Sequence, residues 1–259
     1  MIAFPGRASR SRNRFAKRPH RARRIVGWTA LVLGVIAILA AAAPMLHVFG
    51  TKPYLMFPAH GRRAPVVAVM LSGDIGFGGG MSASVASAFA DRGVMVLGVS
   101  SPVVFAHRRT QDEAVAIVSQ AVRTALKISG ASRVVLVGQS YGADIVATVT
   151  PHLSSDLMAH IDAVDLMVPG RNVYFRADPS GFAYLFDADA HPAPALNTWR
   201  GPPLICIYGK LESDSLCPQL THAPRVIGLP GNHHLQHDPL PLIHAVMGAL
   251  HRITPAIRP

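Results

Sequence analysis

Acidic residues are missing from the first 24 positions of the chain, where arginine and lysine are frequent. The basic residues there are Arg7, Arg10, Arg12, Arg14, Lys17, Arg18, Arg21, Arg23 and Arg24. They account for nine of the eleven formal positive charges that the 259 residues carry in excess. Because the remainder of the chain is close to neutral, a basic nucleic-acid-binding domain is not indicated, and we expect no nucleic-acid partner.

Cysteine is also scarce, and no internal repeat is apparent. At this length the chain fits one domain with its own core plus an appendage. Its two cysteines, Cys206 and Cys217, allow one intrachain disulfide at most. In an oxidising compartment such a bridge would pin the segment between them and contribute about 2–3 kcal/mol. Two buried free thiols are the alternative.

A complete set of metal ligands is missing as well. Asp189-Ala190-His191, Gly73-Asp74 and Gly231–His234 resemble ligand motifs of metal-dependent phosphoesterases. That chemistry needs the Asp-x-His motif first, a second aspartate after Gly-Asp, and an acidic residue where His234 stands. We therefore expect no metal and no other cofactor.

An apolar run from Ile25 to Ala43 carries no charged residue. At about 1.5 Å per residue it covers roughly the 30 Å of a bilayer's hydrocarbon core, and basic residues ahead of it keep the N-terminus in the cytoplasm. The sequence thus predicts a basic cytoplasmic tail over residues 1–24, a transmembrane signal-anchor over 25–46 in the bacterial inner membrane, and a periplasmic domain over 52–259. A cleaved signal peptide is the alternative, because Ala41–Ala43 supplies small residues.

From Val66 onward, apolar strands alternate with helical stretches, which predicts an α/β fold with a small, doubly wound, mostly parallel sheet. Val66–Met70 is the first strand that we recognise. Thr110 and Glu113 form a capping box that opens a helix with Val115, Val118, Val122 and Ala125 on its buried side. Residues 169–199 are rich in aromatic side chains and proline. We interpret them as a candidate lid, with surface packing as the alternative.

The segment Gly138-Gln139-Ser140-Tyr141-Gly142 has the pattern G-x-S-x-G. It follows the apolar strand Val134–Val137 and precedes a helical stretch, which is the context of a nucleophile elbow. Glycine at both ends permits the sharp turn that presents the serine hydroxyl at the edge of the sheet. The sequence therefore predicts an α/β-hydrolase fold with Ser140 as nucleophile.

An activated serine needs a histidine base and an acid, which follow it in the chain in this fold. After the strand Leu204–Tyr208, either Asp214 or Glu212 could hold the imidazole, and we favour Asp214. After the strand Arg225–Leu229, the turn at Gly231 leads to His233 and His234. We favour His233 as the base, with His234 as the alternative.

The oxyanion of the reaction needs backbone N–H donors. We expect one from Tyr141, directly after the serine, and one from Asp74, in the loop after the first recognised strand. Asp144 lies one helical turn after Ser140. The carboxylates of Asp74 and Asp144 are candidate substrate-binding groups, and local structural roles in a turn and at a helix start are the alternatives.

Taken together, these segments resemble the bacterial AcvB/VirJ family of virulence-associated periplasmic proteins. The resemblance rests on Ser72–Gly76, Gly98–Ser101 with Phe105–Thr110, Gly138–Asp144, Cys206–Gly209 with Asp214–Pro218, and Gly231–His234. It implies an α/β-hydrolase fold, supports Ser140, Asp214 and His233 as the triad, and implies hydrolysis of aminoacylated phosphatidylglycerol at the outer face of the inner membrane. The chain departs from the family at Ile75 and Asn232, which leaves open which amino acid is cleaved.

We accordingly expect a membrane-anchored serine hydrolase that releases lysine or alanine from aminoacyl-phosphatidylglycerol. Its partners would be a membrane phospholipid and the inner membrane. Two alternatives remain. The resemblance also allows an interaction factor, catalytic or not, linked to type IV secretion proteins. A carboxylesterase or lipase with another substrate would use the same residues.

Overall fold

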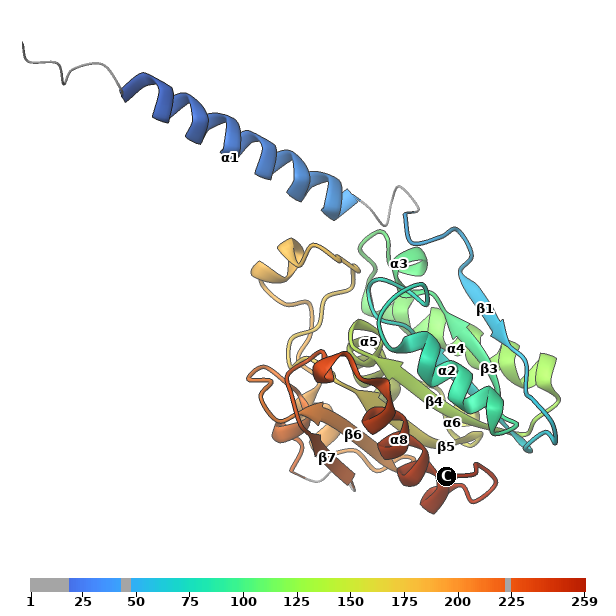
Figure 1. Cartoon of the computed structure of the whole chain (residues 1–259). Coiled ribbons are helices and arrows are strands. Elements are labelled where there is room, and N and C mark those ends of the chain that lie inside the picture. The colour runs from blue at the N-terminus through green and yellow to red at the C-terminus, as the bar shows by residue number, and fades with distance from the viewer. Residues whose placement is uncertain (1–18, 43–47, 222–224) are drawn as a thin grey trace, which may run out of the picture. The chain divides into compact units, whose positions relative to one another are not determined.

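The computed structural model describes residues 19–42, 48–221 and 225–259 (Figure 1). The chain divides into two compact units, one up to Leu39 and one from Ala40 onward. Helix α1, Pro19–Ala42, begins in the first unit and ends three residues beyond the boundary between the two units. No helix among the described residues is long and apolar enough to cross a membrane. The predicted tail over residues 1–24 and the predicted span over 25–46 lie partly outside the described residues.

The second unit is built on a seven-stranded sheet in the order β1-β3-β2-β4-β5-β6-β7. Only β1 pairs antiparallel, and the remaining neighbours are parallel. The strands are β1 Tyr54–Phe57, β2 Val66–Leu71, β3 Met95–Val99, β4 Arg133–Gln139, β5 Ile161–Met167, β6 Leu204–Gly209 and β7 Arg225–Leu229. This confirms the predicted doubly wound, mostly parallel sheet.

Helices cover both faces of the sheet. They are α2 Ser82–Asp91, α3 Ser101–Val104, α4 Gln111–Ser129, α5 Tyr141–Val149, α6 Ser155–Met158, α7 Ala193–Asn197 and α8 Pro239–Ile253. Four 3₁₀ turns complete the described elements: η1 Thr150–His152, η2 Phe182–Leu185, η3 Cys217–Gln219 and η4 Leu235–His237. Helices α2 and α8 lie on one face, and α4 and α5 lie on the other (Figure 1).

Alternation along the strands creates one hydrophobic core on each face. In β2, Val67 and Val69 join the core under α4 and α5, whereas Ala68 and Met70 join the core under α2 and α8. All six residues of β2 are buried, which explains its continuous apolar sequence. Each fully buried large apolar side chain contributes about 1.5–3 kcal/mol of transfer free energy.

The predicted capping box is present at the start of α4. The backbone N–H of Glu113 donates to Thr110 Oγ1 at 3.2 Å, and the backbone N–H of Thr110 donates to Glu113 Oε2 at 2.7 Å. Val118, Val122 and Ala125 are buried on the sheet side of this helix, as predicted. Gly130, in the left-handed region with φ of 70°, ends it.

The prediction that β2 is the first strand is wrong. Strand β1 precedes it and pairs antiparallel with β3, with Tyr54 opposite Val99. It escaped the sequence analysis because it spans only four residues, Tyr54–Phe57, between two prolines. The parallel strands all end at one edge of the sheet, so the loops that follow β2, β4, β6 and β7 meet there.

Candidate active site

Ser140 occupies a strained turn between β4 and α5. Its φ of 53° and ψ of −123° lie outside the regions that residues with a side chain normally adopt. The turn requires glycine on both sides. A Cβ on Gly138 would lie 2.5 Å from the carbonyl oxygen of Gly142, and one on Gly142 would lie 2.3 Å from that of Leu71. The structure thus gives the G-x-S-x-G segment the geometry of a nucleophile elbow.

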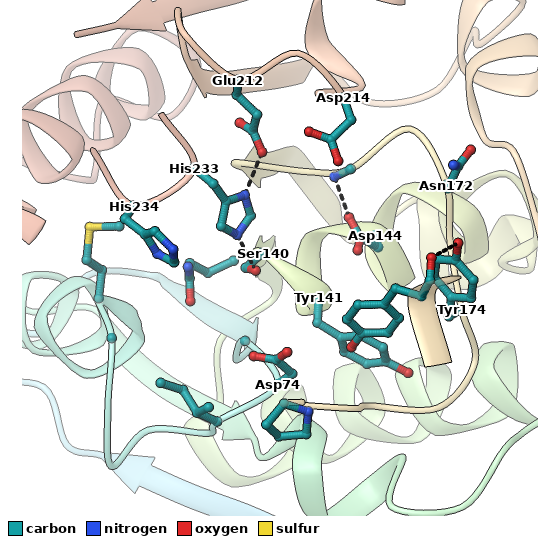
Figure 2. Close-up of a pocket in the computed structure, with 18 of the residues that line it drawn as sticks. Asp74, Ser140, Tyr141, Asp144, Asn172, Tyr174, Glu212, Asp214, His233 and His234 are labelled. Atoms are coloured by element: carbon teal, nitrogen blue, oxygen red, sulfur yellow. Dashed lines mark hydrogen bonds and ion pairs between the residues drawn. The ribbon is translucent and has the colours of Figure 1, made fainter. Parts of the chain in front are cut away.

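Ser140, His233 and Glu212 form a hydrogen-bonded chain (Figure 2). Ser140 Oγ lies 2.8 Å from His233 Nε2, and His233 Nδ1 lies 2.5 Å from Glu212 Oε1. The Glu212 side chain is only 4% exposed. Burial disfavours the imidazolium, but the hydrogen bond and the charge of Glu212 outweigh it, so the pKa of His233 is raised. An oriented base that is stabilised when protonated can accept the proton of the serine hydroxyl.

Glu212 therefore takes the place that we predicted for Asp214. The acid loop and the histidine loop are paired by the backbone, because the N–H of Leu211 donates to the carbonyl of Gly231 at 2.9 Å. This pairing brings the next residue, Glu212, against His233. Asp214 is drawn to another segment, since its carbonyl accepts from the N–H of Arg171 at 2.9 Å, and it is exposed.

The loop after β2 lies against the elbow. A Cβ on Gly73 would lie 3.0 Å from Gln139 Oε1 and 3.6 Å from the Cβ of Ser140. The N–H of Gly73 already donates to Ser82 Oγ, so Asp74 carries the next amide of the loop. At the elbow, Tyr141 opens α5, and a first-turn N–H has no acceptor within its helix. This arrangement is compatible with the predicted oxyanion donors, Tyr141 and Asp74.

A cleft of about 820 Å³ opens at Ser140 and is walled by acidic and phenolic groups. Asp74, Asp144, Glu212 and Asp214 line it, together with Tyr141. Figure 2 shows Asp144, Tyr141 and Asp74 along the same side of the cleft. The lining residues also include Arg171, Asn172, Tyr174, Tyr184, His234 and His237. Ile75, where the chain departs from the family pattern, lines the cleft as well.

Two of these acidic groups, Asp144 and Asp74, are held in an environment that disfavours their negative charge. Burial raises the pKa of Asp144 well above its usual range, and the charges of Glu212, Asp74 and Asp214 raise it further, against a hydrogen bond from Gly170. Burial also raises the pKa of Asp74, although the charge of His233 opposes this.

Asp144 and Tyr141 contribute polar atoms to this wall. Asp144 Oδ1 accepts from the N–H of Gly170 at 2.7 Å. The hydroxyl of Tyr141 is buried and has no hydrogen-bond partner among the described residues. A bound cation would relieve the mutual repulsion of the carboxylates, and an ammonium group would offer a hydrogen-bond partner to the hydroxyl of Tyr141.

The segment 169–199, predicted as a lid, forms part of this wall. Tyr174, Pro179 and Tyr184 line the cleft. The hydroxyl of Tyr174 donates to the carbonyl of Tyr184 at 2.9 Å, and the two rings pack at a tilt of 34° with centroids 4.9 Å apart. Asp189, part of the apparent Asp-x-His motif, accepts from the N–H of Phe175 at 2.9 Å, so its carboxylate supports this segment.

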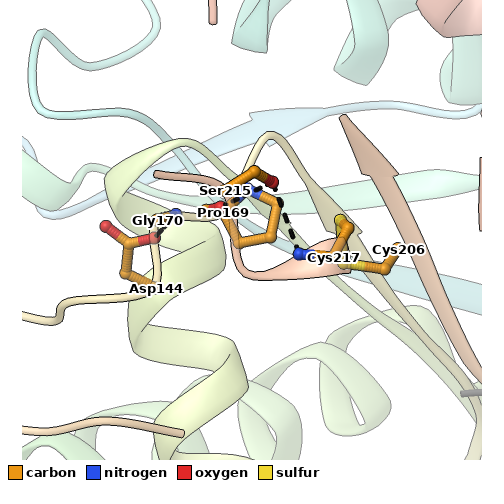
Figure 3. The surroundings of a disulfide bond; sticks show 6 residues. All are labelled: Asp144, Pro169, Gly170, Cys206, Ser215 and Cys217. Atoms are coloured by element: carbon orange, nitrogen blue, oxygen red, sulfur yellow. Dashed lines mark hydrogen bonds between the residues drawn. A yellow bond between two sulfur atoms is a disulfide. The ribbon is translucent and has the colours of Figure 1, made fainter. Parts of the chain in front are cut away.

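A disulfide joins Cys206 in β6 to Cys217, with the Cα atoms 5.5 Å apart, which confirms the predicted bridge (Figure 3). Glu212 lies in the loop that it closes. Within this loop Ser215 Oγ donates to the carbonyl of Pro169 at 3.3 Å, and the next residue, Gly170, holds Asp144. The bridge therefore supports two walls of the cleft, the acid loop and the segment Pro169–Gly170 after β5, which positions Asp144.

Sequence analysis did not identify Tyr174, Tyr184, Arg171 or Asn172 as cleft residues. They belong to a segment with little regular structure, so no periodicity indicated which side chains face the cleft. The aromatic content of residues 169–199 was the only signal.

The elbow, the histidine and the buried glutamate on this sheet define the protein as a member of the α/β-hydrolase superfamily. Solved structures support the fold. Est1E from Butyrivibrio proteoclasticus matches with a TM-score of 0.54 and 13% identity, covering 77% of this chain and 92% of that one. An alpha-beta serine hydrolase homologue from Coxiella burnetii matches with a TM-score of 0.56 and 14% identity, covering 76% and 90%. A likeness at this identity shows the fold alone.

The family is shown by the sequence itself. The family described as bacterial virulence protein (VirJ) matches residues 65–254, and the chain belongs to that family. Comparison with functionally curated sequences finds no match.

Proposed function

We propose that this protein is a serine hydrolase that cleaves the aminoacyl ester of aminoacyl-phosphatidylglycerol, with lysine or alanine as the amino acid released. Ser140 is the nucleophile, His233 the base, and Glu212 the acid that orients the imidazole. The observation that carries the substrate class is the acidic wall of the cleft beside Ser140. An aminoacyl ester differs from an ordinary lipid ester by its ammonium group, and that group would be stabilised by these carboxylates.

The reaction follows from the geometry of the hydrogen-bonded chain. Ser140 Oγ attacks the ester carbonyl while His233 Nε2 takes its proton, and the negative charge on the carbonyl oxygen is met by backbone N–H groups. When the intermediate collapses, His233 protonates the departing glycerol oxygen and phosphatidylglycerol leaves. Water, deprotonated by His233, then attacks the aminoacyl-serine. When the bond to Ser140 Oγ breaks, His233 returns the proton to this oxygen, so that the amino acid is released and Ser140 is regenerated.

We also propose that the domain acts in the periplasm, tethered to the inner membrane by the apolar segment that follows the basic tail. The disulfide supports an oxidising compartment, because such bridges rarely persist in the cytosol. A tether suits a substrate that cannot leave the bilayer. The anchor rests on the sequence pattern alone.

The test measures amino-acid release from liposomes that contain lysyl- or alanyl-phosphatidylglycerol, with the full chain and its Ser140→Ala variant. Release by the wild type and its loss in the variant would establish both nucleophile and substrate class. No release from either lipid by the folded, disulfide-bonded protein would contradict the proposal and favour a different ester or an interaction role.

The acidic wall is tested by Asp144→Asn, which keeps the shape of the side chain and removes its charge. We expect kcat/KM for lysyl-phosphatidylglycerol to fall about tenfold or more, as for the loss of a hydrogen-bonded charge partner, and an uncharged ester to be less affected. Asp112→Asn, at the exposed start of α4, is the matched control. Equal effects on charged and uncharged esters would contradict the assignment of Asp144 to the ammonium group.

A further inference from the structure

Two histidines in the cleft have no role in the reaction described above. His234 and His237 both line the cleft. Their rings stack, with centroids 5.2 Å apart and planes 12° from parallel. Both residues are exposed, so their ring nitrogens are accessible to a ligand. His234 also stands edge-on to the base His233, with ring centroids 5.6 Å apart.

The backbone that places His237 is strained. Leu235, Gln236 and His237 have φ values of 44°, 59° and 59°, so three successive residues other than glycine adopt the left-handed region. Each such residue costs about 1–2 kcal/mol. The buried side chain of Leu235 anchors the turn. The backbone N–H of His237 donates to the carbonyl of His234 at 2.8 Å, which closes the turn. Strain of this kind persists where the surrounding structure enforces it, and it is frequent at functional sites.

This pair lies away from the acidic wall. In Figure 2, His234 lies on one side of Ser140, whereas Asp144 and Tyr174 lie on the other. Helices α2 and α8 pack against each other and both begin at the edge of the sheet where the parallel strands end. Residues at their starts, Ser84 and Pro239, line the cleft with the histidines.

The chemistry of this side suits an anion. Imidazole nitrogens donate hydrogen bonds to phosphate oxygens, and a protonated ring adds positive charge. The nearby start of α2 contributes a weak positive potential. The carboxylate that follows the pair, Asp238, is engaged elsewhere, because it accepts from the N–H of Leu240 at the start of α8.

We propose that His234 and His237 form a subsite for the phosphodiester of the substrate lipid. This inference rests on the proposed function. With the ester carbonyl at Ser140, the aminoacyl group extends to Asp144, and the glycerol on the other side of the ester carries its phosphodiester to the histidine pair. The cleft would then bind both charged groups of the lipid headgroup, the ammonium at one end and the phosphate at the other.

The test uses the full chain and two soluble substrates, the lysyl ester of glycerol and the lysyl ester of glycerophosphoglycerol. They share the ester and the ammonium group, and only the second has a phosphodiester. We expect the wild type to show a kcat/KM about tenfold or more higher for the second, through a lower KM. In the double variant His234→Ala/His237→Asn this ratio should fall close to one. Asparagine at position 237 tolerates the left-handed backbone.

His244→Gln provides the matched control, because this exposed residue of α8 does not line the cleft. It should keep the wild-type ratio. A wild-type preference that persists in the folded double variant would overturn the subsite. A wild type that cleaves both esters equally would overturn it too, whether or not the variant folds. Cleavage of neither ester would instead contradict the proposed function.

A further arm distinguishes the lipid headgroup from free phosphate. Glycerophosphoglycerol should inhibit wild-type cleavage of the glycerol ester competitively, and more strongly than inorganic phosphate at equal concentration. Inhibition by inorganic phosphate alone would assign the histidine pair to a free anion and overturn the lipid assignment.

Discussion

Glu212 and Asp214 stand two residues apart in one loop, and only Glu212 contacts the imidazole of His233. We expect Glu212→Gln to lower kcat by about three to four orders of magnitude, because an amide neither enforces the productive tautomer nor stabilises the imidazolium. Asp214→Asn should retain kcat within a few-fold. Steady-state kinetics on a lysyl ester checks both variants, with circular dichroism as the control for folding. The reverse ranking would return the role of acid to Asp214.

The choice between these two acids shows where sequence reasoning stops at the scale of residues. The pattern around Ser140 and the turn before His233 predicted the nucleophile and the base. In the structure Ser140 Oγ lies 2.8 Å from His233 Nε2. The position of the acid depends on the backbone pairing of Leu211 with Gly231 and on the reach of a glutamate. Neither is visible in the order of residues along the loop.

A second residue, Asp165, bears on stability rather than on the reaction. It lies in β5, fully buried, and neither carboxylate oxygen has a hydrogen-bond partner among the described residues. Burial raises its pKa to about 8. Because the folded state holds this proton and the unfolded state releases it near pH 4, stability should decline as pH rises from about 4 to about 8.

Asp165→Asn should remove that pH dependence. We expect the variant to gain stability over the wild type at pH 8 and much less at pH 5, as measured by urea unfolding at both pH values. An equal shift at the two values would show that Asp165 does not hold its proton in the folded state.

At the scale of elements, the disulfide between β6 and the loop after it supports both the Glu212 loop and the segment Pro169–Gly170 that holds Asp144. The variant Cys206→Ala/Cys217→Ala should lose about 2–3 kcal/mol of unfolding free energy. It should also lower kcat/KM, because Glu212 and Gly170 lose their common support. Urea unfolding and ester hydrolysis measure the two effects.

The wild type treated with a thiol reductant is the matched comparison, since it breaks the same bond without changing side-chain volume. A variant with full activity and reduced stability would show that the bridge serves the fold but not the cleft.

Elements with strong local signals could be predicted from sequence. The continuous apolar run of β2, the capping box of α4 and the strand before the elbow each specify their own structure. Strand β1 is too short for such a signal and depends on pairing with β3. The segment 169–199 likewise takes its form from long-range contacts, such as the ring pair of Tyr174 and Tyr184.

At the scale of the whole molecule, the unit from Ala40 onward forms a compact body of its own. A protein comprising residues 48–259 should therefore cleave a soluble lysyl ester at the rate of the full chain. On liposomes that carry lysyl-phosphatidylglycerol it should be slower by at least about tenfold, because it loses the effective concentration that a tether gives. Initial rates on the two substrates test this. Equal rates of both proteins on liposomes would argue against the anchor.

The bond between Cys206 and Cys217 also has a consequence for when the protein can work. A chain still in the cytosol keeps its thiols reduced, so the covalent support of the acid loop and of the segment Pro169–Gly170 is absent. The newly made protein would then have low activity on lipids of the inner leaflet. It would become fully active only after its domain crosses the membrane and the disulfide forms. Formation of the disulfide would thus restrict hydrolysis of the lipid to the outer leaflet.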